Sequence, residues 1–216
     1  MSTHLKIDFV SDVSCPWCAI GLASLEKALT KVSGEMDVEM HFQPFELNPH
    51  MEQGGENIIE HLAGKYGTTP AQIEQSQDMI KERGAALGFT FDMQKRTRVY
   101  NTFDAHRLLH WADLEGKQRA LKHALFMAYF TEGRDPSDHE VLVDVAQQAG
   151  LDAERARSIL SSDEYAKDVR DRERFYSDRG IHAVPAVIIN ERHLIQGGQP
   201  VEIFEQALRQ VARADR

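Results

Sequence analysis

The sequence predicts an α/β fold in which two groups of strands and helices flank a long helical block. Apolar and polar residues alternate in 5–10 and again in 36–42, which is the period of half-buried strands. Helical periodicity prevails from 56 to 179, and a β-branched run returns in 184–189. We therefore expect a single α/β domain that is interrupted by a helical insertion. The expected bounds are 1–55 and 163–216 for the α/β domain and 56–162 for the insertion.

The first helix is expected to begin at a pair of cysteines. Apolar residues recur at three- and four-residue steps from 22 to 32, and Gly34 then ends the pattern as a helix C-terminal glycine does. Cys15 and Cys18 precede this pattern and directly follow the first strand. The strand–helix–strand unit therefore places both thiols at the N-terminus of a helix.

The helical block is expected to hold four or five helices and no strand. A capping threonine followed by proline at Thr69–Pro70 marks one helix start. The segments Ser137–Glu140 and Ser161–Glu164 both fit the capping-box pattern. Two of the expected helices run from about 100 to 114 and from about 117 to 130.

The C-terminal part predicts two strands and a final helix. The run 184–189 is the first strand, 190–192 is a hairpin turn, and 193–195 is the partner strand. Pro200 then opens a helix whose apolar residues fall on one face.

Charge and composition exclude several classes of protein. The 216 residues carry 25 Lys and Arg against 34 Asp and Glu, a formal charge of −9, which argues against a protein that grips nucleic acid by neutralising phosphates. No apolar stretch is long enough to span a membrane, and the N-terminus lacks the pattern of a secretion signal. We therefore expect a cytoplasmic protein with no membrane or nucleic-acid partner.

The segment Cys15-Pro16-Trp17-Cys18 carries the chemistry. A cysteine attacks a disulfide as its thiolate, and the unpaired N–H groups of a helix N-terminus stabilise that charge. Cys15 is therefore the predicted nucleophile, and Cys18, one turn further, is the predicted resolving thiol that closes a disulfide with it. Pro16 suits the first helical turn, and Trp17 would place an apolar surface beside the sulfur atoms.

A second candidate element is Val184–Pro185. A proline at the start of a strand has no N–H to donate to the hydrogen bonds of the sheet. Its peptide bond can be trans at a strand edge or cis beside a functional site. With a cysteine pair at a helix start and this order of elements, we expect the cis form. His182 lies three residues earlier, either as a surface residue or as a group that tunes the thiolate.

Four segments together resemble a known family. They are Ser14–Cys18, Asn101–Leu108, Gly180–Pro185 and Gly198–Pro200, and they span nearly the whole chain. The sequence resembles DsbA-like thioredoxin-fold oxidoreductases, most closely the FrnE-like branch.

This resemblance implies a thioredoxin fold (βαβ…αββα) split by a helical domain that covers the active site. It implies Val184 and a cis Pro185 on the substrate-facing loop, with Asn101 and His106 facing the cleft. It also implies thiol–disulfide exchange by the Cys15–Cys18 redox centre without a bound metal or organic cofactor, and a homodimer.

The substrate would be a protein or small molecule that contains a disulfide or thiol. Glutathione or another thiol would recycle the enzyme. The sequence leaves the direction of exchange open.

Three alternatives remain at this stage. His106 and His110 lie four residues apart on one helix face, and with Cys15 and Cys18 they make a Cys2His2 set for zinc, although the chain between the two halves is far longer than in a zinc finger. The fold also resembles kappa-class glutathione transferases and 2-hydroxychromene-2-carboxylate isomerases, which generally carry serine at the position of Cys15. The third alternative is a redox-sensitive, chaperone-like binding protein.

Overall fold

The computed structural model describes residues 3–214. A four-stranded sheet with the order β2-β1-β5-β6 lies at its centre, and β1 runs parallel to β2 and antiparallel to β5. The strands and their two flanking helices appear in the predicted order along the chain. Their bounds are β1 Thr3–Ser11, α1 Pro16–Val32, β2 Met36–Pro44, β5 Ala186–Ile189, β6 His193–Gln196 and α9 Val201–Ala214.

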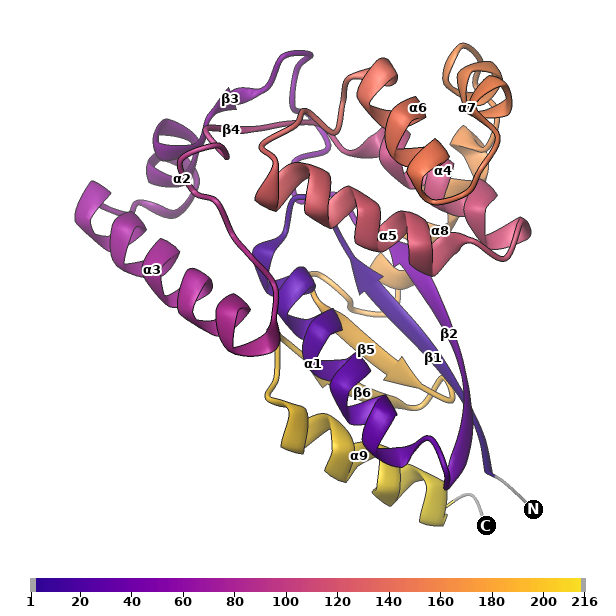
Figure 1. Cartoon of the computed structure of the whole chain (residues 1–216). Coiled ribbons are helices and arrows are strands. Elements are labelled where there is room, and N and C mark those ends of the chain that lie inside the picture. Colours follow the sequence, from indigo (N-terminus) through magenta and orange to yellow (C-terminus); the bar gives the residue numbers. More distant parts are fainter. Residues whose placement is uncertain (1–2, 215–216) are drawn as a thin grey trace.

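Strand β1 is the buried centre of the molecule. Leu5, Ile7 and Phe9 are fully buried, and the Phe9 ring meets the Phe42 ring of β2 edge to face with centroids 5.8 Å apart. Helices α1 and α9 pack against each other and cover one face of the sheet (Figure 1). Because β1 has a neighbour on each side and helices against it, its C-terminal end is held firmly where the cysteines follow.

The block between β2 and β5 is more finely divided than the sequence predicts. The part of the chain that the structure describes holds seven α-helices there, not four or five, and a two-stranded ribbon where no strand was expected. The predicted helix 117–130 is an α-helix that continues as a π-helical turn. The bounds are β3 Glu56–Asn57, α2 Ile58–Tyr66, α3 Pro70–Leu87, β4 Arg98–Val99, α4 Phe103–Leu114, α5 Gln118–Phe126, the π-helical turn Met127–Thr131, α6 His139–Gln148, α7 Ala153–Leu160 and α8 Ala166–Ser177.

Of the three helix starts that capping patterns predict in this block, only the one at Thr69–Pro70 has the predicted cap. Thr69 forms the expected capping box with Gln72 at the start of α3. At α6 the cap is Asp138 rather than Ser137, because its carboxylate accepts hydrogen bonds from the backbone N–H groups of Glu140 and Val141. The segment Ser161–Glu164 does not cap a helix, since α8 begins only after Tyr165, whose backbone is left-handed.

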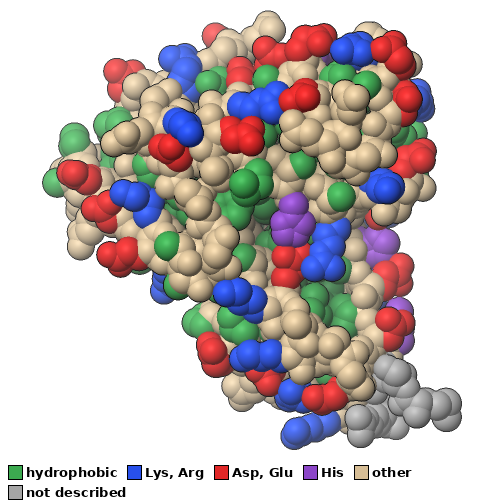
Figure 2. All heavy atoms as spheres, in the orientation of Figure 1, with side chains coloured by type: hydrophobic (Ala, Val, Ile, Leu, Met, Phe, Trp, Pro, Cys, Tyr) green, Lys and Arg blue, Asp and Glu red, His purple; other side chains and the backbone are tan. Residues whose placement is uncertain are grey.

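The helical block contacts the sheet at the β2 edge. Helices α4, α5 and α8 contact β2, while α3 lies beside α1 (Figure 1). The predicted domain boundaries stay a prediction, and their outermost residues 1, 2, 215 and 216 lie outside the described part. Among the helices of residues 3–214, none is long and apolar enough to cross a membrane. On the face in Figure 2, acidic and basic side chains are interspersed.

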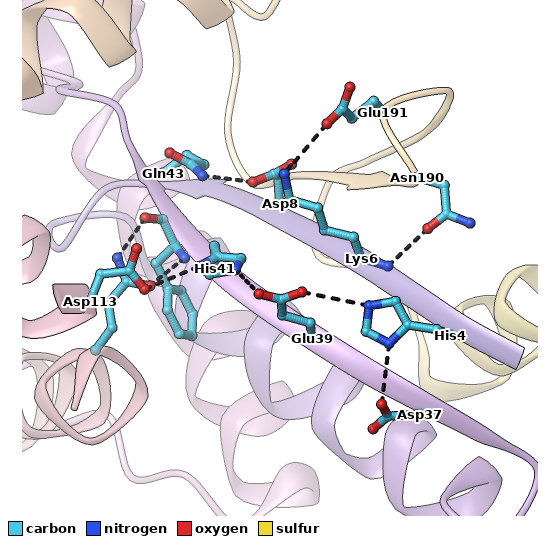
Figure 3. A network of polar contacts seen from close by, with 12 residues as sticks. His4, Lys6, Asp8, Asp37, Glu39, His41, Gln43, Asp113, Asn190 and Glu191 are labelled. Carbon is cyan, nitrogen blue, oxygen red and sulfur yellow. Dashed lines mark hydrogen bonds and ion pairs between the residues drawn. The ribbon is translucent and has the colours of Figure 1, made fainter. Parts of the chain in front are cut away.

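A histidine connects the β2 edge to the helical block. His41 of β2 contacts Asp113 of α4 at 3.0 Å through Nδ1 and Glu39 at 2.8 Å through Nε2 (Figure 3). Burial lowers the pKa of His41, but the hydrogen bonds and charges of Glu39 and Asp113 outweigh it and raise the pKa above its usual value. Protonated His41 therefore stabilises the folded chain.

The link predicts a pH-dependent contribution to stability. A histidine with a raised folded-state pKa stabilises the fold fully below its unfolded pKa and ceases to do so as the pH rises through the folded value. We expect His41→Gln to lower the free energy of unfolding by about 0.5–1 kcal/mol at acidic pH and by less above pH ~8. Urea unfolding at both pH values measures this. The exposed His50, changed to Gln, is the control, and an equal loss at both pH values for His41→Gln would contradict the assignment.

Candidate active site

The N-terminus of α1 holds Cys15, the predicted nucleophile. Cys15 is the N-cap residue and Pro16 occupies the first turn, where no backbone donor is needed. The Cys15 carbonyl accepts a hydrogen bond from the Cys18 N–H at 3.1 Å, so the two residues lie within one turn. Both are free thiols, 4% and 0% exposed. The thiol of Cys15 therefore lies at the N-terminus of α1, beside the unpaired N–H groups of its first turn.

The loop before β5 closes the other side of the site. The Val184–Pro185 bond is cis, as expected, and the Cys15 thiol donates to the Val184 carbonyl at 3.8 Å. A Cβ atom on Gly21 would lie 3.1 Å from Pro185 Cγ, and one on Gly198 would lie 2.9 Å from the Trp17 carbonyl oxygen. These two glycines therefore allow α1 to approach the proline loop and the chain before α9 closely.

Cys18 lies inside the protein beside a buried amine. Burial, the hydrogen bond with Cys15 and the charge of Cys15 raise the pKa of the Cys18 thiol well above its usual value, while Lys122 and a backbone hydrogen bond from Asp12 act against this rise. The Lys122 side chain is 0% exposed, and its Nζ lies 4.9 Å from the ring centre of Phe126 without a hydrogen-bond partner. Burial lowers the pKa of Lys122 to about 8, against the charges of Cys18, Asp12 and Cys15.

A cavity of about 370 Å³ opens beside Cys15. It lies between the N-terminus of α1 and helices α2 and α3, and no aspartate or glutamate of residues 3–214 lines it. Its charged and titratable lining groups other than Cys15 are His61, Lys65, Tyr66 and Arg96. The remaining lining residues are Ser14, Pro16, Trp17, Leu47, Asn48, Leu62, Thr68, Gln72, Ile73, Ser76, Gln77, Ile80, Val99 and Val184.

Arg96 is a buried cation on this cavity. It is 6% exposed, stacks on the rings of Tyr129 and Phe130 at 5.1 and 5.0 Å, and donates to the Ser14 carbonyl at 3.4 Å. Its Nε has no hydrogen-bond partner, and none of the ion pairs found among the described residues includes Arg96. Among the described residues the cavity lining includes an arginine and no carboxylate, which suits a ligand that carries negative charge.

Most of the chain matches one family model. Residues 6–209 match the DsbA-like thioredoxin domain. The chain belongs to this family. It is also 35% identical to the probable DsbA oxidoreductase of Streptomyces coelicolor, whose structure superposes with a TM-score of 0.90 over 99% of this chain and 92% of that chain. The predicted DsbA-like thioredoxin fold is thus confirmed, while the FrnE-like branch stays a prediction.

Two more distant structures share the fold alone. One is a 2-hydroxychromene-2-carboxylate isomerase, 14% identical with a TM-score of 0.73, and the coverage is 97% of each chain. The other is the cytosolic disulfide reductase DsbM of Pseudomonas aeruginosa with GSH, 19% identical with a TM-score of 0.64, and the coverage is 96% of this chain and 99% of that chain. The DsbA-like fold therefore occurs in both disulfide chemistry and isomerase chemistry.

The predicted supporting residues of this DsbA-like site fall into two groups. Pro16, Trp17 and Val184 line the cavity with Cys15, and Arg83 of α3 lies 5.2 Å from the Trp17 ring centre. His182 is exposed on the loop before Pro185 and is absent from the lining.

Asn101 and His106 do not line the cavity either. Asn101 begins α4 by accepting a hydrogen bond from the Phe103 N–H at 2.9 Å. His106 is buried behind the turn that carries the cysteines, where its Nε2 donates to the Phe45 carbonyl at 3.1 Å and lies 3.4 Å from Asp12 Oδ1.

The four side chains of the zinc alternative are not assembled. His106 faces Asp12, whereas the His110 ring lies 5.0 Å from the ring of Tyr165. Within residues 3–214 there is no group of three or more His, Cys, Asp or Glu side chains that could hold a metal ion.

Sequence reasoning missed Asp12, Arg96 and Lys122, which surround the dithiol. For Lys122 a signal exists, because Gln118, Leu121, Leu125 and Phe126 share its buried helix face. Nothing in the local pattern marks Asp12 or Arg96 as buried.

The unpaired amine of Lys122 predicts a stability effect. Its folded-state pKa of about 8 is below its unfolded value, so the folded chain gains stability relative to the unfolded chain as the pH rises from 8 to above 10. We expect Lys122→Met to raise the free energy of unfolding at pH ~7 by about 1–3 kcal/mol, and by less near pH ~10. Urea unfolding at both pH values tests this against the exposed control Lys117→Met. Destabilisation of Lys122→Met at neutral pH would contradict it.

Proposed function

We propose that this DsbA-like protein is a thiol–disulfide oxidoreductase that uses Cys15 as nucleophile and Cys18 as resolving thiol. The observation that carries the proposal is the position of Cys15, which caps α1, faces the cis-proline loop and opens on the cavity, with Cys18 one turn below. The burial of Cys18 fits its role, because it leaves Cys15 as the thiol that meets the substrate.

The two exchange steps transfer two electrons to a substrate disulfide. The Cys15 thiolate attacks one sulfur, the substrate S–S bond breaks, and a mixed disulfide forms while the other substrate sulfur leaves as a thiolate. Cys18 then loses its proton and attacks Cys15 Sγ, which releases the second substrate thiolate and closes the Cys15–Cys18 disulfide. Two external thiols return the protein to the dithiol and are themselves oxidised to a disulfide. The oxidised protein runs the same steps in reverse on a substrate dithiol.

Glutathione is the proposed recycling thiol and small co-substrate. At neutral pH it carries two carboxylates and one ammonium group, and the cavity offers Lys65 and Arg96 with no acidic side chain. The Lys65 Nζ donates to the Leu47 carbonyl and to Asn48 Oδ1, both at 2.7 Å, which leaves a third donor for a ligand. The similarity in fold to DsbM, a cytosolic disulfide reductase seen with GSH, supports both the thiol and a cytoplasmic location.

Substitution of each cysteine tests the dithiol mechanism. Cys15→Ala is expected to abolish disulfide exchange, and Cys18→Ala is expected to accumulate mixed disulfides on Cys15, because the resolving step is lost. Mass spectrometry after incubation with oxidised glutathione measures the adduct. Cys15→Ser is the matched control for the isomerase alternative, since turnover of a chromene carboxylate that survives this change would replace our proposal. Full exchange activity of Cys15→Ala would also contradict it.

The charge of the cavity predicts selectivity among thiols. Lys65→Met is expected to raise KM for glutathione about fivefold, the equivalent of about 1 kcal/mol, because one cation that meets a carboxylate is lost. Reduction by the neutral 2-mercaptoethanol is expected to change little. Steady-state kinetics with both thiols measure this, with the exposed Lys81→Met as control. An equal loss for both thiols would show that Lys65 acts on the shape of the cavity and not through charge.

A further inference from the structure

The side chain of Asp12 connects three segments of the chain behind the dithiol. Its Oδ2 accepts hydrogen bonds from the Leu47 N–H at 2.7 Å and from the Ser14 hydroxyl at 2.9 Å. Its Oδ1 accepts from the Ser14 N–H at 3.3 Å and lies 3.4 Å from His106 Nε2. These partners come from the turn before Cys15, the chain after β2 and helix α4.

The backbone of Asp12 touches both cysteines. Its carbonyl accepts a hydrogen bond from the Cys15 N–H at 3.3 Å, and its N–H donates a hydrogen bond to the sulfur of Cys18. A rotation of Asp12 would therefore move the nucleophile and remove a donor from the resolving thiol. Asp12 is not among the residues that line the cavity.

The carboxylate is buried and charged. Its side chain is 1% exposed, and burial by itself raises the pKa of Asp12. The hydrogen bonds from His106, Leu47 and Thr102 and the charge of His106 outweigh burial, so the pKa lies below its usual value. A buried charge with this many donors resists any rearrangement that would break one of them.

We propose that Asp12 is a positioning residue that holds Cys15 and Cys18 in their reactive arrangement. Because His106 contacts Asp12, this arrangement also depends on the position of α4. The proposal rests on the proposed exchange reaction for its kinetic readout. The rate at which Cys15 is alkylated provides a readout that does not depend on that reaction.

Asp12→Asn is the test, with Asp8→Asn as matched control. Asn has nearly the same shape but replaces one acceptor oxygen by an NH2 group, which cannot accept a hydrogen bond. Whichever way the amide is turned, this group faces a pair of donors, either the Ser14 N–H and His106 or the Leu47 N–H and the Ser14 hydroxyl. Asp8 is also a buried carboxylate on the same stretch of chain, 4% exposed, but it accepts from Gln43 at 2.6 Å on the sheet, away from the dithiol. Any general effect of a lost buried carboxylate therefore appears in both variants.

We expect Asp12→Asn to lower kcat/KM for disulfide exchange about tenfold or more, to change the rate of iodoacetamide alkylation of Cys15, and to shift the redox equilibrium with glutathione. Asp8→Asn is expected to leave all three within about twofold of the parent. If both variants change equally, or if Asp12→Asn keeps the three parental values, the proposal is wrong.

A second variant tests the proposal in case Asp12→Asn does not fold. If Asp12→Asn does not fold by circular dichroism, His106→Leu, which removes the donor from α4 and leaves the turn intact, is expected to show the same three changes in a weaker form. Parental values in that folded variant would overturn the link to α4. Failure of the parent protein to exchange disulfides would contradict the proposed function alone, because the alkylation rates still test Asp12.

Discussion

A carboxylate held out of water constrains everything around it, and Asp12 occupies the point where the first strand of this protein ends. The cost of burying this charge is offset by N–H and O–H donors from the turn before Cys15, from the chain after β2 and from α4. Each of those segments must therefore approach the same two oxygens. This requirement also fixes where α1 starts, because Cys15 follows Asp12 by three residues and its N–H donates a hydrogen bond to the Asp12 carbonyl.

The charges near the thiols differ from those of the chain as a whole. The protein carries a formal charge of −9, but Arg96 and Lys122 lie beside the dithiol without a carboxylate partner. A buried cation that lacks an anion costs stability, and such costs are tolerated mainly at functional sites. The buried carboxylate of Asp12 acts on Lys122 through its charge, and the proposed exchange reaction would add a thiolate as a second anion near these cations.

Local patterns were sufficient for the α/β part of the fold and for the dithiol. Strand alternation, Pro16 and the run that ends at Gly34 located β1, α1 and β2, and Pro185 indicated the loop that faces the cysteines. The helical block was harder, because the π-helical turn at Met127–Thr131 directly continues α5 and the strands β3 and β4 have only two residues each, too few for an alternating pattern. His106 was noticed, but its partner was not, since a pairing with Asp12 joins residues that only the tertiary fold brings together.

The insertion is part of the reaction centre and not only a cover. The α/β part supplies both thiols and the cis-proline loop, whereas the helical block supplies His106 to the turn, Lys122 to the interior beside Cys18 and Arg96 to the cavity. The π-helical turn contributes as well, because it carries the Tyr129 and Phe130 rings on which Arg96 stacks. Any motion of this block relative to the sheet would change the hydrogen bonds behind the dithiol and the charges around it together. Helices α2 and α3 line the cavity, and α4 and α5 carry the groups behind the dithiol, so the helical block contributes to both sides of the site.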